Sequence, residues 1–478
     1  MATIIDNQDG PVRDFALEVM SHLPYSPNED QLVFIVAMGR FVLSTEERAV
    51  MVLNGYAGTG KTSLTGAIVK TLARRHHPSV LLAPTGRAAH IFTDYSGHAA
   101  YTIHRKIYRQ QNYGSDSFSL AENKHTGTLF IVDEASMIAN GAADGGAVFG
   151  TGRLLDDLIT SVYSGAGCRL LLLGDAAQLP PVGQATSPAL QVPLLQGYGL
   201  TVYQVFLRQV ARQAQESGIL HNATLLRQSM EQEILTRPQL DLAHWPDIET
   251  VTSEWLMETL SDCYDRDGMD QTIVVTRSNK RATLFNTGIR NRILYREDLL
   301  TSGDMLLVAK NNYHWAEDYE QMDFIANGDV CRVTRVWGDV EWRYGLRFAN
   351  VTVEFPDHDH LEMDVKIVLD ALLSDSPALS REQSEQLFDG VMAELPGDKR
   401  ARYKALKQHP YFNALQVKFA YAVTCHKAQG GQWSNVLIDM GAILPEAMVT
   451  LDFHRWLYTA LTRATRHVYL INYSEPAE

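Results

Sequence analysis

The chain contains seven short apolar runs that each end in a turn or a polar residue, and this pattern constrains the fold most strongly. Runs of this length and composition are typical of buried parallel strands that are followed by a helix. Four lie before residue 180 and three after residue 270, so the sequence predicts two α/β lobes that bind ligands at the carboxyl ends of their strands. The runs are AVMVLNG (49–55), SVLLAPTG (79–86), TLFIVDEAS (128–136), CRLLLLGD (168–175), TIVVTRSN (272–279), NVLIDMG (435–441) and HVYLINY (467–473).

The first run leads into GYAGTGKT (55–62), and a helical stretch, SLTGAIVKTLARR, follows it. A glycine-rich turn between a strand and a helix lets backbone amides cradle phosphate groups. In this pattern the ammonium of Lys61 reaches the β- and γ-phosphates, and the hydroxyl of Thr62 binds Mg²⁺. The sequence therefore predicts a site for ATP and Mg²⁺. Its cradle residues are Gly55, Ala57, Gly58, Thr59 and Gly60.

A second signal is the acidic pair in IVDEASM (131–137), at the end of the third apolar run. Asp133 is expected to hold Mg²⁺, directly or through water, and Glu134 is expected to polarise the attacking water. An acidic pair after a strand is weak evidence by itself. Together with the upstream phosphate loop it predicts a hydrolytic nucleotide site.

The net charge of −14 excludes a uniformly basic, nucleic-acid-binding coat, but it leaves room for a local basic channel. The four cysteines lie far apart without a CxxC pair, which favours small core residues in a reducing compartment over a zinc site or disulfides. We find neither a signal peptide pattern nor 18 consecutive apolar residues, so the expected location is cytoplasmic, with no membrane partner.

An ordered series of motifs resembles those of superfamily 1 DNA helicases, most closely the RecD and Dda branch. The resemblance covers residues 31 to 464. It implies two RecA-like lobes, ATP in the cleft, single-stranded DNA across both lobes, and movement from 5′ to 3′. The motifs are GYAGTGKT (55–62), APTGRAA (83–89), TIH (102–104), IVDEAS (131–136), GDAAQLPPVG (174–183), RQAQESGI (212–219), VTCHKAQGGQW (423–433) and YTALTRA (458–464).

The resemblance also implies roles around the nucleotide. Gln31 would recognise adenine through its amide, and Gln178 would contact the γ-phosphate. Arg212 and Arg463 would reach the γ-phosphate from the second lobe, where planar guanidiniums suit the spread charge of the transition state. Arg208 is the alternative to Arg212. Two further residues of the second lobe, Gln429 and Gly430, would also approach the nucleotide.

DNA contacts should use hydroxyls, backbone amides and cations for phosphates, and flat side chains for bases. His104 and His426 are among the expected contacts, and both have an alternative role as hydrogen-bonded structural residues. The basic run DKRARYKALK (398–407) is predicted to be a solvated helix face, with a DNA-binding track as the alternative. The resemblance points to Thr85, Gly86, Arg87, Thr102, His104, Asn279, Thr424 and His426 as DNA contacts.

The segment 106–125 has two polar, partly alternating arms around Tyr113-Gly114-Ser115-Asp116, which fits a hairpin turn. It lies where relatives carry a pin that splits the strands. Our hypothesis is that Tyr113 or Phe118, near the tip, stacks on the last base pair. A simple surface loop is the alternative.

The expected architecture is α/β, with two RecA-like P-loop lobes built on parallel sheets, a hairpin insertion in lobe 1 and an SH3-like β insertion in lobe 2. The helical stretch 376–408 is longer than a minimal member needs, and its role stays open. The predicted boundaries are 1–195 for lobe 1 with the pin at 106–127, then 196–300 and 413–478 for lobe 2, and 301–412 for the insertion.

The predicted function is that of an ATP-dependent DNA helicase that acts on single-stranded DNA and on junctions of single and double strands. Two alternatives are an ATP-gated nucleic-acid-binding switch and an RNA motor of the same superfamily, since these motifs mainly contact backbone. The expected protein partners are of the single-strand-binding, replication or repair type. The chain is expected to act as a monomer, and the sequence does not fix its pathway.

Overall fold

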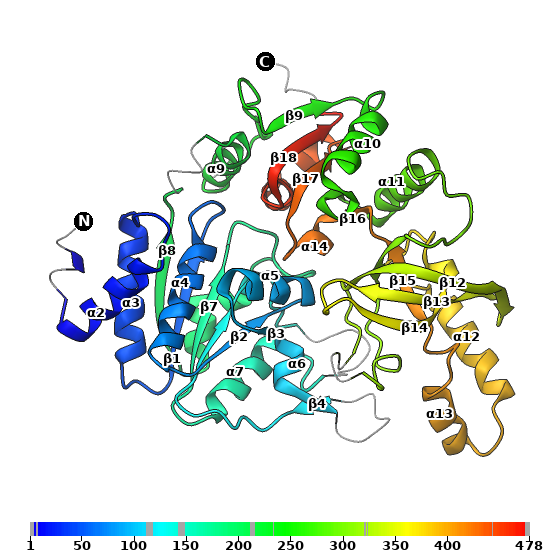
Figure 1. Cartoon of the computed structure of the whole chain (residues 1–478), viewed down its shortest axis with the longest axis horizontal. Coiled ribbons are helices and arrows are strands. Elements are labelled where there is room, and N and C mark those ends of the chain that lie inside the picture. Colours follow the sequence, from blue (N-terminus) through cyan, green and yellow to red (C-terminus); the bar gives the residue numbers. More distant parts are fainter. Residues whose placement is uncertain are drawn as a thin grey trace. The chain divides into compact units, whose positions relative to one another are not determined.

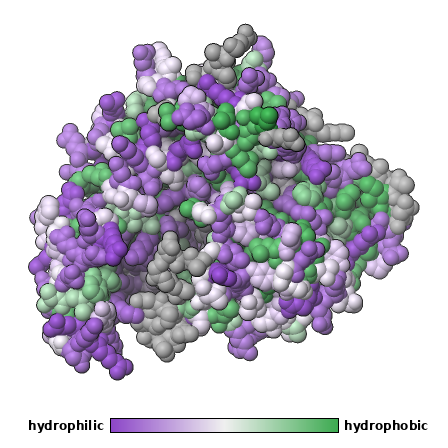
Figure 2. Space-filling view, turned by 180° about the vertical axis from the view of Figure 1, so that it is seen from behind, coloured by the Kyte–Doolittle hydropathy of each residue, from purple (hydrophilic) through white to green (hydrophobic). Residues whose placement is uncertain are grey.

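A computed structural model of the chain describes residues 4–5, 8–110, 118–141, 149–210, 216–232, 234–319, 322, 324–441 and 443–473. They form two compact units. The first comprises 1–246 and 445–462, and the second comprises 247–444 and 463–478. None of the described helices is both long and apolar enough to cross a membrane. Hydrophilic side chains cover much of the face seen in Figure 2, and hydrophobic ones form separate patches there.

The first unit is built on a six-stranded parallel sheet with the order β3-β2-β6-β7-β1-β8 (Figure 1). Alternate residues of β1 enter different cores: Met51 and Leu53 pack with α2, α3 and α4, whereas Val50 and Val52 pack with α6 and α7. Helices therefore cover both faces of the sheet. The strands are β1 (Ala49–Gly55), β2 (Ser79–Ala83), β3 (Ala100–Thr102), β6 (Leu129–Val132), β7 (Arg169–Gly174) and β8 (Thr201–Leu207).

The helices of the first unit include two short segments from late in the chain, α15 and α16. The helix α16 packs against α9, which fixes this late segment in the first unit. The helices are α2 (Gly10–Ser21), α3 (Glu29–Leu43), α4 (Lys61–Arg74), α5 (Gly86–Ser96), α6 (Ile103–Ile107), α7 (Leu154–Ser164), α8 (Val192–Gly197), α9 (Gly218–Met230), α15 (Pro445–Met448) and α16 (Leu451–Leu461).

The first unit extends beyond the boundary predicted at residue 195, because β8 pairs with β1 from Ala49↔Thr201 to Gly55↔Leu207. The apolar runs did not reveal β8, since most of its residues are exposed or half-buried on the sheet edge. The structure thus differs from the sequence-based division, which placed 196–246 in the second lobe.

The second unit contains a five-stranded parallel sheet with the order β16-β10-β17-β18-β9. The two parallel sheets with their helices confirm the predicted fold class of two RecA-like α/β lobes. The elements of this part are β9 (Ile248–Val251), α10 (Leu256–Asp267), β10 (Thr272–Thr276), α11 (Asn279–Arg292), β16 (Ala422–Thr424), α14 (Cys425–Ala428), β17 (Trp433–Asp439) and β18 (Ala464–Ile471).

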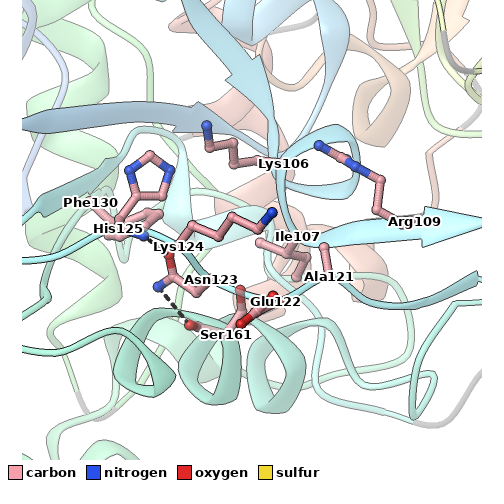
Figure 3. A pocket seen from close by; sticks show the side chains of 10 residues that line it. All are labelled: Lys106, Ile107, Arg109, Ala121, Glu122, Asn123, Lys124, His125, Phe130 and Ser161. Atoms are coloured by element: carbon pink, nitrogen blue, oxygen red, sulfur yellow. Dashed lines mark hydrogen bonds between the residues drawn. The ribbon is translucent and has the colours of Figure 1, made fainter.

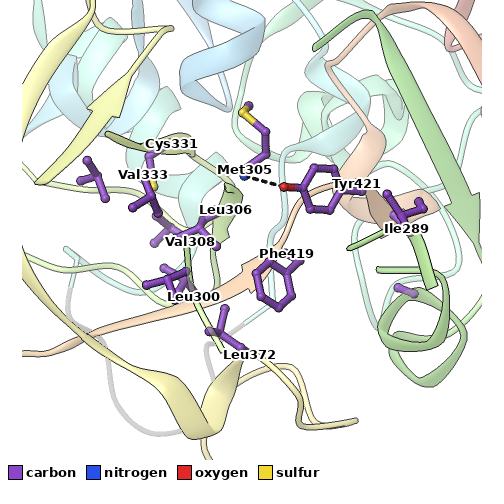
Figure 4. Close-up of a cluster of buried hydrophobic side chains, with 14 of the residues drawn as sticks. Ile289, Leu300, Met305, Leu306, Val308, Cys331, Val333, Leu372, Phe419 and Tyr421 are labelled. Atoms are coloured by element: carbon purple, nitrogen blue, oxygen red, sulfur yellow. Dashed lines mark hydrogen bonds between the residues drawn. The ribbon is translucent and has the colours of Figure 1, made fainter. Parts of the chain in front are cut away.

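Between α11 and β16 the chain forms a closed five-stranded barrel. Its interior continues into the core of the second unit, where Tyr421 accepts a hydrogen bond from the backbone N–H of Met305 (Figure 4). The barrel includes a strand beyond residue 412, the predicted end of the insertion. Its likeness to an SH3 barrel stays a prediction. The strands are β11 (Met305–Val308), β12 (Val330–Arg343), β13 (Leu346–Phe355), β14 (Leu361–Val368) and β15 (Leu415–Phe419).

Two helices, α12 (Arg381–Glu394) and α13 (Lys399–Lys407), occupy the charged stretch near the barrel. Only Leu406 of α13 is buried, so its basic residues form an exposed helix face, as predicted. In the first unit, the arms of the predicted hairpin form the short antiparallel pair β4 (Tyr108–Gln110) and β5 (Phe118–Leu120). The four cysteines are free and buried, which fits their predicted role as core residues.

Candidate nucleotide and nucleic-acid site

The phosphate loop connects β1 to α4 at the carboxyl edge of the first sheet. Gly58 and Gly60 have positive φ angles of 72° and 85°, which a glycine adopts without strain. The Nζ atom of Lys61 donates hydrogen bonds to the carbonyl oxygens of Gly55 and Tyr56. An ammonium held by carbonyls can exchange them for phosphate oxygens.

The acidic pair follows β6 at the same edge, because β6, β7 and β1 are neighbouring parallel strands. Asp133 accepts hydrogen bonds from the hydroxyl of Tyr95 at 2.6 Å and from the backbone N–H of Glu134 at 2.8 Å. Burial and the carboxylate of Asp133 raise the pKa of Tyr95 well above its usual value, so Tyr95 remains a donor. Glu134 has a φ of 49°, an unusual conformation for a residue with a side chain.

The donor set fits Mg²⁺, which favours hard oxygen ligands and keeps several waters and phosphate oxygens in its shell. Thr62 is exposed in the first turn of α4, which follows β1. Asp133 follows β6, and one strand, β7, separates β6 from β1 in the sheet. Among the described residues, no three His, Cys, Asp or Glu side chains form a metal-binding group. A Mg²⁺ site built from one hydroxyl, one carboxylate and substrate phosphates needs no such group.

The leucines of the run LLLLGD lie in β7, and the segment after this strand places Asp175 and Gln178 in the interior, with 1% and 4% of their surface exposed. Asp175 accepts a hydrogen bond from the hydroxyl of Tyr458 on α16 at 2.7 Å. That hydroxyl also accepts one from the backbone N–H of Ala57 in the phosphate loop. Within the described residues, Oε1 of Gln178 is buried without a hydrogen-bond partner, so it is available to a ligand or a bound water.

Gln31 lies beside the phosphate loop. Its side chain completes a capping box with Asn28 at the start of α3, and its Nε2 atom donates to the carbonyl oxygen of Thr59 at 2.9 Å. A Cβ atom on Gly60 would meet Nε2 of Gln31 at 2.6 Å and the hydroxyl of Tyr25 at 2.7 Å. These contacts anchor the loop on α3, and recognition of adenine by Gln31 stays a prediction.

Predicted DNA contacts of the first unit lie at the carboxyl ends of the neighbouring strands β2 and β3. Thr85 caps α5 by accepting from the N–H of Ala88, and Thr102 caps α6 by accepting from the N–H of Arg105. A capping hydroxyl still has its own hydrogen to donate to a phosphate. Gly86 and Arg87 begin α5 next to Thr85.

The ring of His104 packs against Phe149 at a centroid distance of 4.9 Å and against Tyr108 at 5.7 Å. Burial lowers the pKa of His104 to about 4, against a smaller opposing effect of Asp157. The ring is therefore neutral at pH 7. This environment favours the structural role over an ionic contact with DNA.

Phe118 lies in the arm β5, paired with Gln110, and its ring packs against Phe149 at 4.8 Å. Gln110↔Phe118 is the described pair next in sequence to residues 111–117, and Tyr108↔Leu120 lies at the other end of the arms. Stacking of Phe118 on a base pair stays a prediction. Tyr113 and Arg212 lie outside the described residues.

In the second unit, Asn279 and Thr424 line a small shared pocket, because β10 and β16 pair in parallel with Thr276 opposite Thr424. Lys427 and Lys418 line the same pocket, and burial lowers the pKa of both ammonium groups, that of Lys418 to about 8. His426 is exposed at the start of α14.

Gln429 and Gly430 follow α14, and Gly430 has a φ of 75°. Arg463 is 3% exposed and donates to the carbonyl oxygen of Gly431 at 3.3 Å, while its own carbonyl accepts from the N–H of Trp433. The structure thus gathers Gln429, Gly430 and Arg463 within the second unit. Their approach to a nucleotide stays a prediction.

Sequence reasoning missed Tyr458, Asp175 and Tyr95 as members of the site. Tyr458 and Asp175 lie inside recognised motifs, and this position could have marked them as candidate site residues. Nothing in the local sequence indicates that their side chains form a hydrogen bond with each other. Tyr95 lies on α5 and had no such signal. Only the tertiary fold brings its hydroxyl to Asp133.

Comparisons with known proteins agree with the two-part organisation. Residues 37–239 match the model of an AAA domain, and residues 419–471 match the model of a UvrD-like helicase C-terminal domain. The first match covers the phosphate loop and the acidic pair, and the second covers Gln429, Gly430 and Arg463.

Among curated proteins, the chain is 26% identical over 425 residues to an ATP-dependent RecD2 DNA helicase of Deinococcus radiodurans. The alignment covers 87% of this chain and 46% of the relative, so the chain spans about half the length of that protein. An uncharacterized protein of Methanocaldococcus jannaschii is 23% identical, with 90% of this chain and 37% of the relative covered. A crystal structure of Pif1 helicase from Bacteroides aligns with a TM-score of 0.48 and 16% identity, over 94% of this chain and 93% of the other.

Proposed function

We propose that this chain is a RecD-like member of helicase superfamily 1 and an ATP-dependent DNA helicase, because residues 37–239 match an AAA domain and residues 419–471 match a UvrD-like helicase C-terminal domain. One observation carries the proposal. A single edge of the first sheet holds the nucleotide residues after β6, β7 and β1 and the predicted DNA contacts after the adjacent strands β2 and β3. A shift of this edge on nucleotide binding or hydrolysis would therefore also move the neighbouring DNA contacts.

In the proposed chemistry, the phosphate loop and Lys61 bind the triphosphate, and Glu134 orients and polarises the attacking water. Thr62 and Asp133 would hold Mg²⁺, which neutralises charge on the β- and γ-phosphates. Gln178 contributes its amide oxygen, which has no partner within the described residues, to the region of the γ-phosphate, either directly or through a water.

We propose that Arg463 and Arg212 supply the positive charge that stabilises the transition state of hydrolysis. Gln429 and Gly430 would be further nucleotide contacts. Arginine suits this task because its planar guanidinium remains charged and can donate to two oxygens at once. The buried position of Arg463 in the helicase C-terminal domain supports this assignment.

On the DNA, we propose contacts by the hydroxyls of Thr85 and Thr102 and by Asn279 and Thr424, with translocation from 5′ to 3′. The protein would act as a monomer on single strands and on single-strand to duplex junctions, with replication or repair proteins as partners. A reducing, cytoplasmic location is supported by the four buried free cysteines.

The decisive experiment compares forked substrates with a 5′ or a 3′ single-stranded tail, made of DNA or RNA, with ATP present. We expect unwinding of DNA forks with a 5′ tail and none with the Lys61→Ala variant. Unwinding from the 3′ tail alone would overturn the polarity. ATP-dependent binding without strand separation would identify a switch, and preference for RNA forks would identify an RNA motor.

A hairpin pin is a further part of the proposal, with Tyr113 or Phe118 as its base-stacking residue. Replacing residues 111–117 with a short glycine-serine linker should abolish unwinding while DNA-stimulated ATP hydrolysis persists. Full unwinding by that variant would show that these residues form no pin.

A further inference from the structure

A pocket of about 510 Å³ opens on the first unit, near the amino ends of the strands and therefore away from the nucleotide edge. Its walls come from the end of α6, from β4, from the segment 121–125, from β6 and from α7 (Figure 3). The volume lies within the range of sites that bind small molecules. The lining residues are Lys106, Ile107, Arg109, Ala121, Glu122, Asn123, Lys124, His125, Phe130 and Ser161.

The pocket concentrates positive charge on a chain whose net charge is −14. Figure 3 shows Lys106, Arg109 and Lys124 extending around the same open space. Glu122 is the one carboxylate among the described lining residues. Within the described part of the chain, none of the three cations forms a salt bridge. Among these described residues, their charge is therefore not neutralised by an ion pair.

The walls are held in place before any ligand arrives. Asn123 donates to the carbonyl oxygens of Ser161 at 2.9 Å and of Val162 at 3.2 Å, at the end of α7, and accepts from the N–H of His125. A Cβ atom on Gly165 would meet Nδ2 of Asn123 and the carbonyl oxygen of His125, both at 2.6 Å. Glycine at this position therefore allows the segment 121–125 to lie against α7.

The cations are also partly positioned. One nitrogen of Arg109 donates to the carbonyl oxygens of Arg105 and Tyr108, both at 2.8 Å, which leaves the rest of the guanidinium for other acceptors. Burial lowers the pKa of Lys106, and the charge of Arg109 lowers it further. Burial and the charge of Lys106 likewise lower the pKa of His125. In both shifts burial is the larger cause, and the smaller contribution comes from a neighbouring cation.

We propose that this pocket binds a backbone phosphate of the nucleic acid, as a contact separate from the nucleotide site and from the strand contacts at the carboxyl edge. Arginine and lysine side chains bind phosphate groups. The backbone of a nucleic-acid strand carries such phosphates, so a bound strand would supply the anion and no separate phosphate ligand is needed. The pocket adjoins β4 and β5, so a strand held here passes the base of the hairpin arms. The nature of the strand rests on the proposed function.

Binding of a fluorescent DNA fork with a 5′ tail, measured by anisotropy over a series of salt concentrations, tests the contribution of the charges. We expect Lys124→Ala and Lys106→Ala each to weaken binding roughly 3- to 10-fold and to reduce the salt slope by about 1. Glu122→Gln should strengthen binding, because it removes the pocket's carboxylate. Lys70→Ala, at an exposed position on α4, is the matched control and should bind like the parent.

Opposite signs for Lys124→Ala and Glu122→Gln separate a binding role from a folding defect. Parent-like binding by the pocket variants would overturn the proposal, as would an equal loss in Lys70→Ala. ATP hydrolysis without DNA should be unchanged in all four variants, since the pocket lies away from the phosphate loop.

Protection of lysines from acetic anhydride, read by mass spectrometry on the full chain, tests the pocket independently of unwinding. The fork should protect Lys106 and Lys124 and leave Lys70 reactive, whereas inorganic phosphate at the same total phosphate concentration should protect none of them. Equal protection by inorganic phosphate would identify a free-anion site and overturn the strand assignment. No protection by either probe would overturn the pocket itself, even if the chain unwinds DNA.

Discussion

The hydroxyl of Tyr458 donates a hydrogen bond to Oδ2 of Asp175 at 2.7 Å and accepts one from the backbone N–H of Ala57 at 2.9 Å. Tyr458 is 283 residues from Asp175 and 401 residues from Ala57 in the sequence. One buried side chain thus connects α16, the end of β7 and the phosphate loop. The nucleotide edge of the first unit is completed by a segment from near the end of the described chain.

We expect Tyr458→Phe to lower the free energy of unfolding by about 1–3 kcal/mol, because it leaves a buried carboxylate and a buried N–H without this partner. Urea unfolding of the full chain measures the change. Tyr101→Phe, at an exposed tyrosine of the same unit, should stay within about 0.5 kcal/mol of the parent. Equal effects of the two substitutions on the free energy of unfolding would show that the hydrogen bonds of Tyr458 do not stabilise the fold.

Glu134→Gln should keep affinity for ATP and Mg²⁺ and lose most turnover, by roughly 100-fold or more, since the amide cannot accept the water's proton. Fluorescent-nucleotide binding and steady-state hydrolysis give the two values. Glu47→Gln, at an exposed glutamate, serves as the control for the loss of one charge. Full turnover by the Glu134 variant would mean that another group activates the water.

Gln178→Ala should leave nucleotide binding largely intact yet reduce the number of base pairs unwound per ATP hydrolysed. The physical reason is that its buried amide oxygen has no partner within the described residues, which suits a contact made only during the nucleotide cycle. Parallel measurement of hydrolysis and unwinding checks this, with Gln196→Ala at an exposed position as the control. An unchanged ratio would remove Gln178 from the coupling.

The lowered pKa of His104 predicts a specific dependence of stability on pH. Burial depresses the pKa to about 4 in the folded chain, below the ordinary value of 6.5, so the unfolded chain binds more protons between these values. The contribution of His104 is therefore fully present above about pH 6.5 and is lost as the pH falls towards 4. Its size is at most about 3.5 kcal/mol, at about 1.4 kcal/mol per pKa unit.

Urea unfolding of the parent and of His104→Phe at several pH values isolates this contribution from those of other histidines. Phenylalanine keeps the contacts with Phe149 and Tyr108 and cannot titrate. The stability difference between the two proteins should change between pH 6.5 and 4. A constant difference would mean that His104 is not held neutral by the fold.

The sequence by itself determined the local chemistry. The apolar runs predicted β1, β2, β6, β7, β10, β17 and β18, because each buried strand carries its own hydrophobic signal. The phosphate loop was equally readable, since its glycines and Lys61 act within one turn of the chain. Comparable local signals were lacking for the three-residue strands β3 and β16 and for the edge strand β8.

Only the tertiary structure decided which distant segments meet. Pairing of β8 with β1 and packing of α16 on α9 gave the first unit residues that the sequence had placed in the second lobe. The bonds of Tyr458, the aromatic surroundings of Phe118 and the basic pocket around Lys124 arise in the same way. Such contacts depend on burial and on hydrogen bonds between residues far apart in sequence, which leave no periodic pattern in the chain itself.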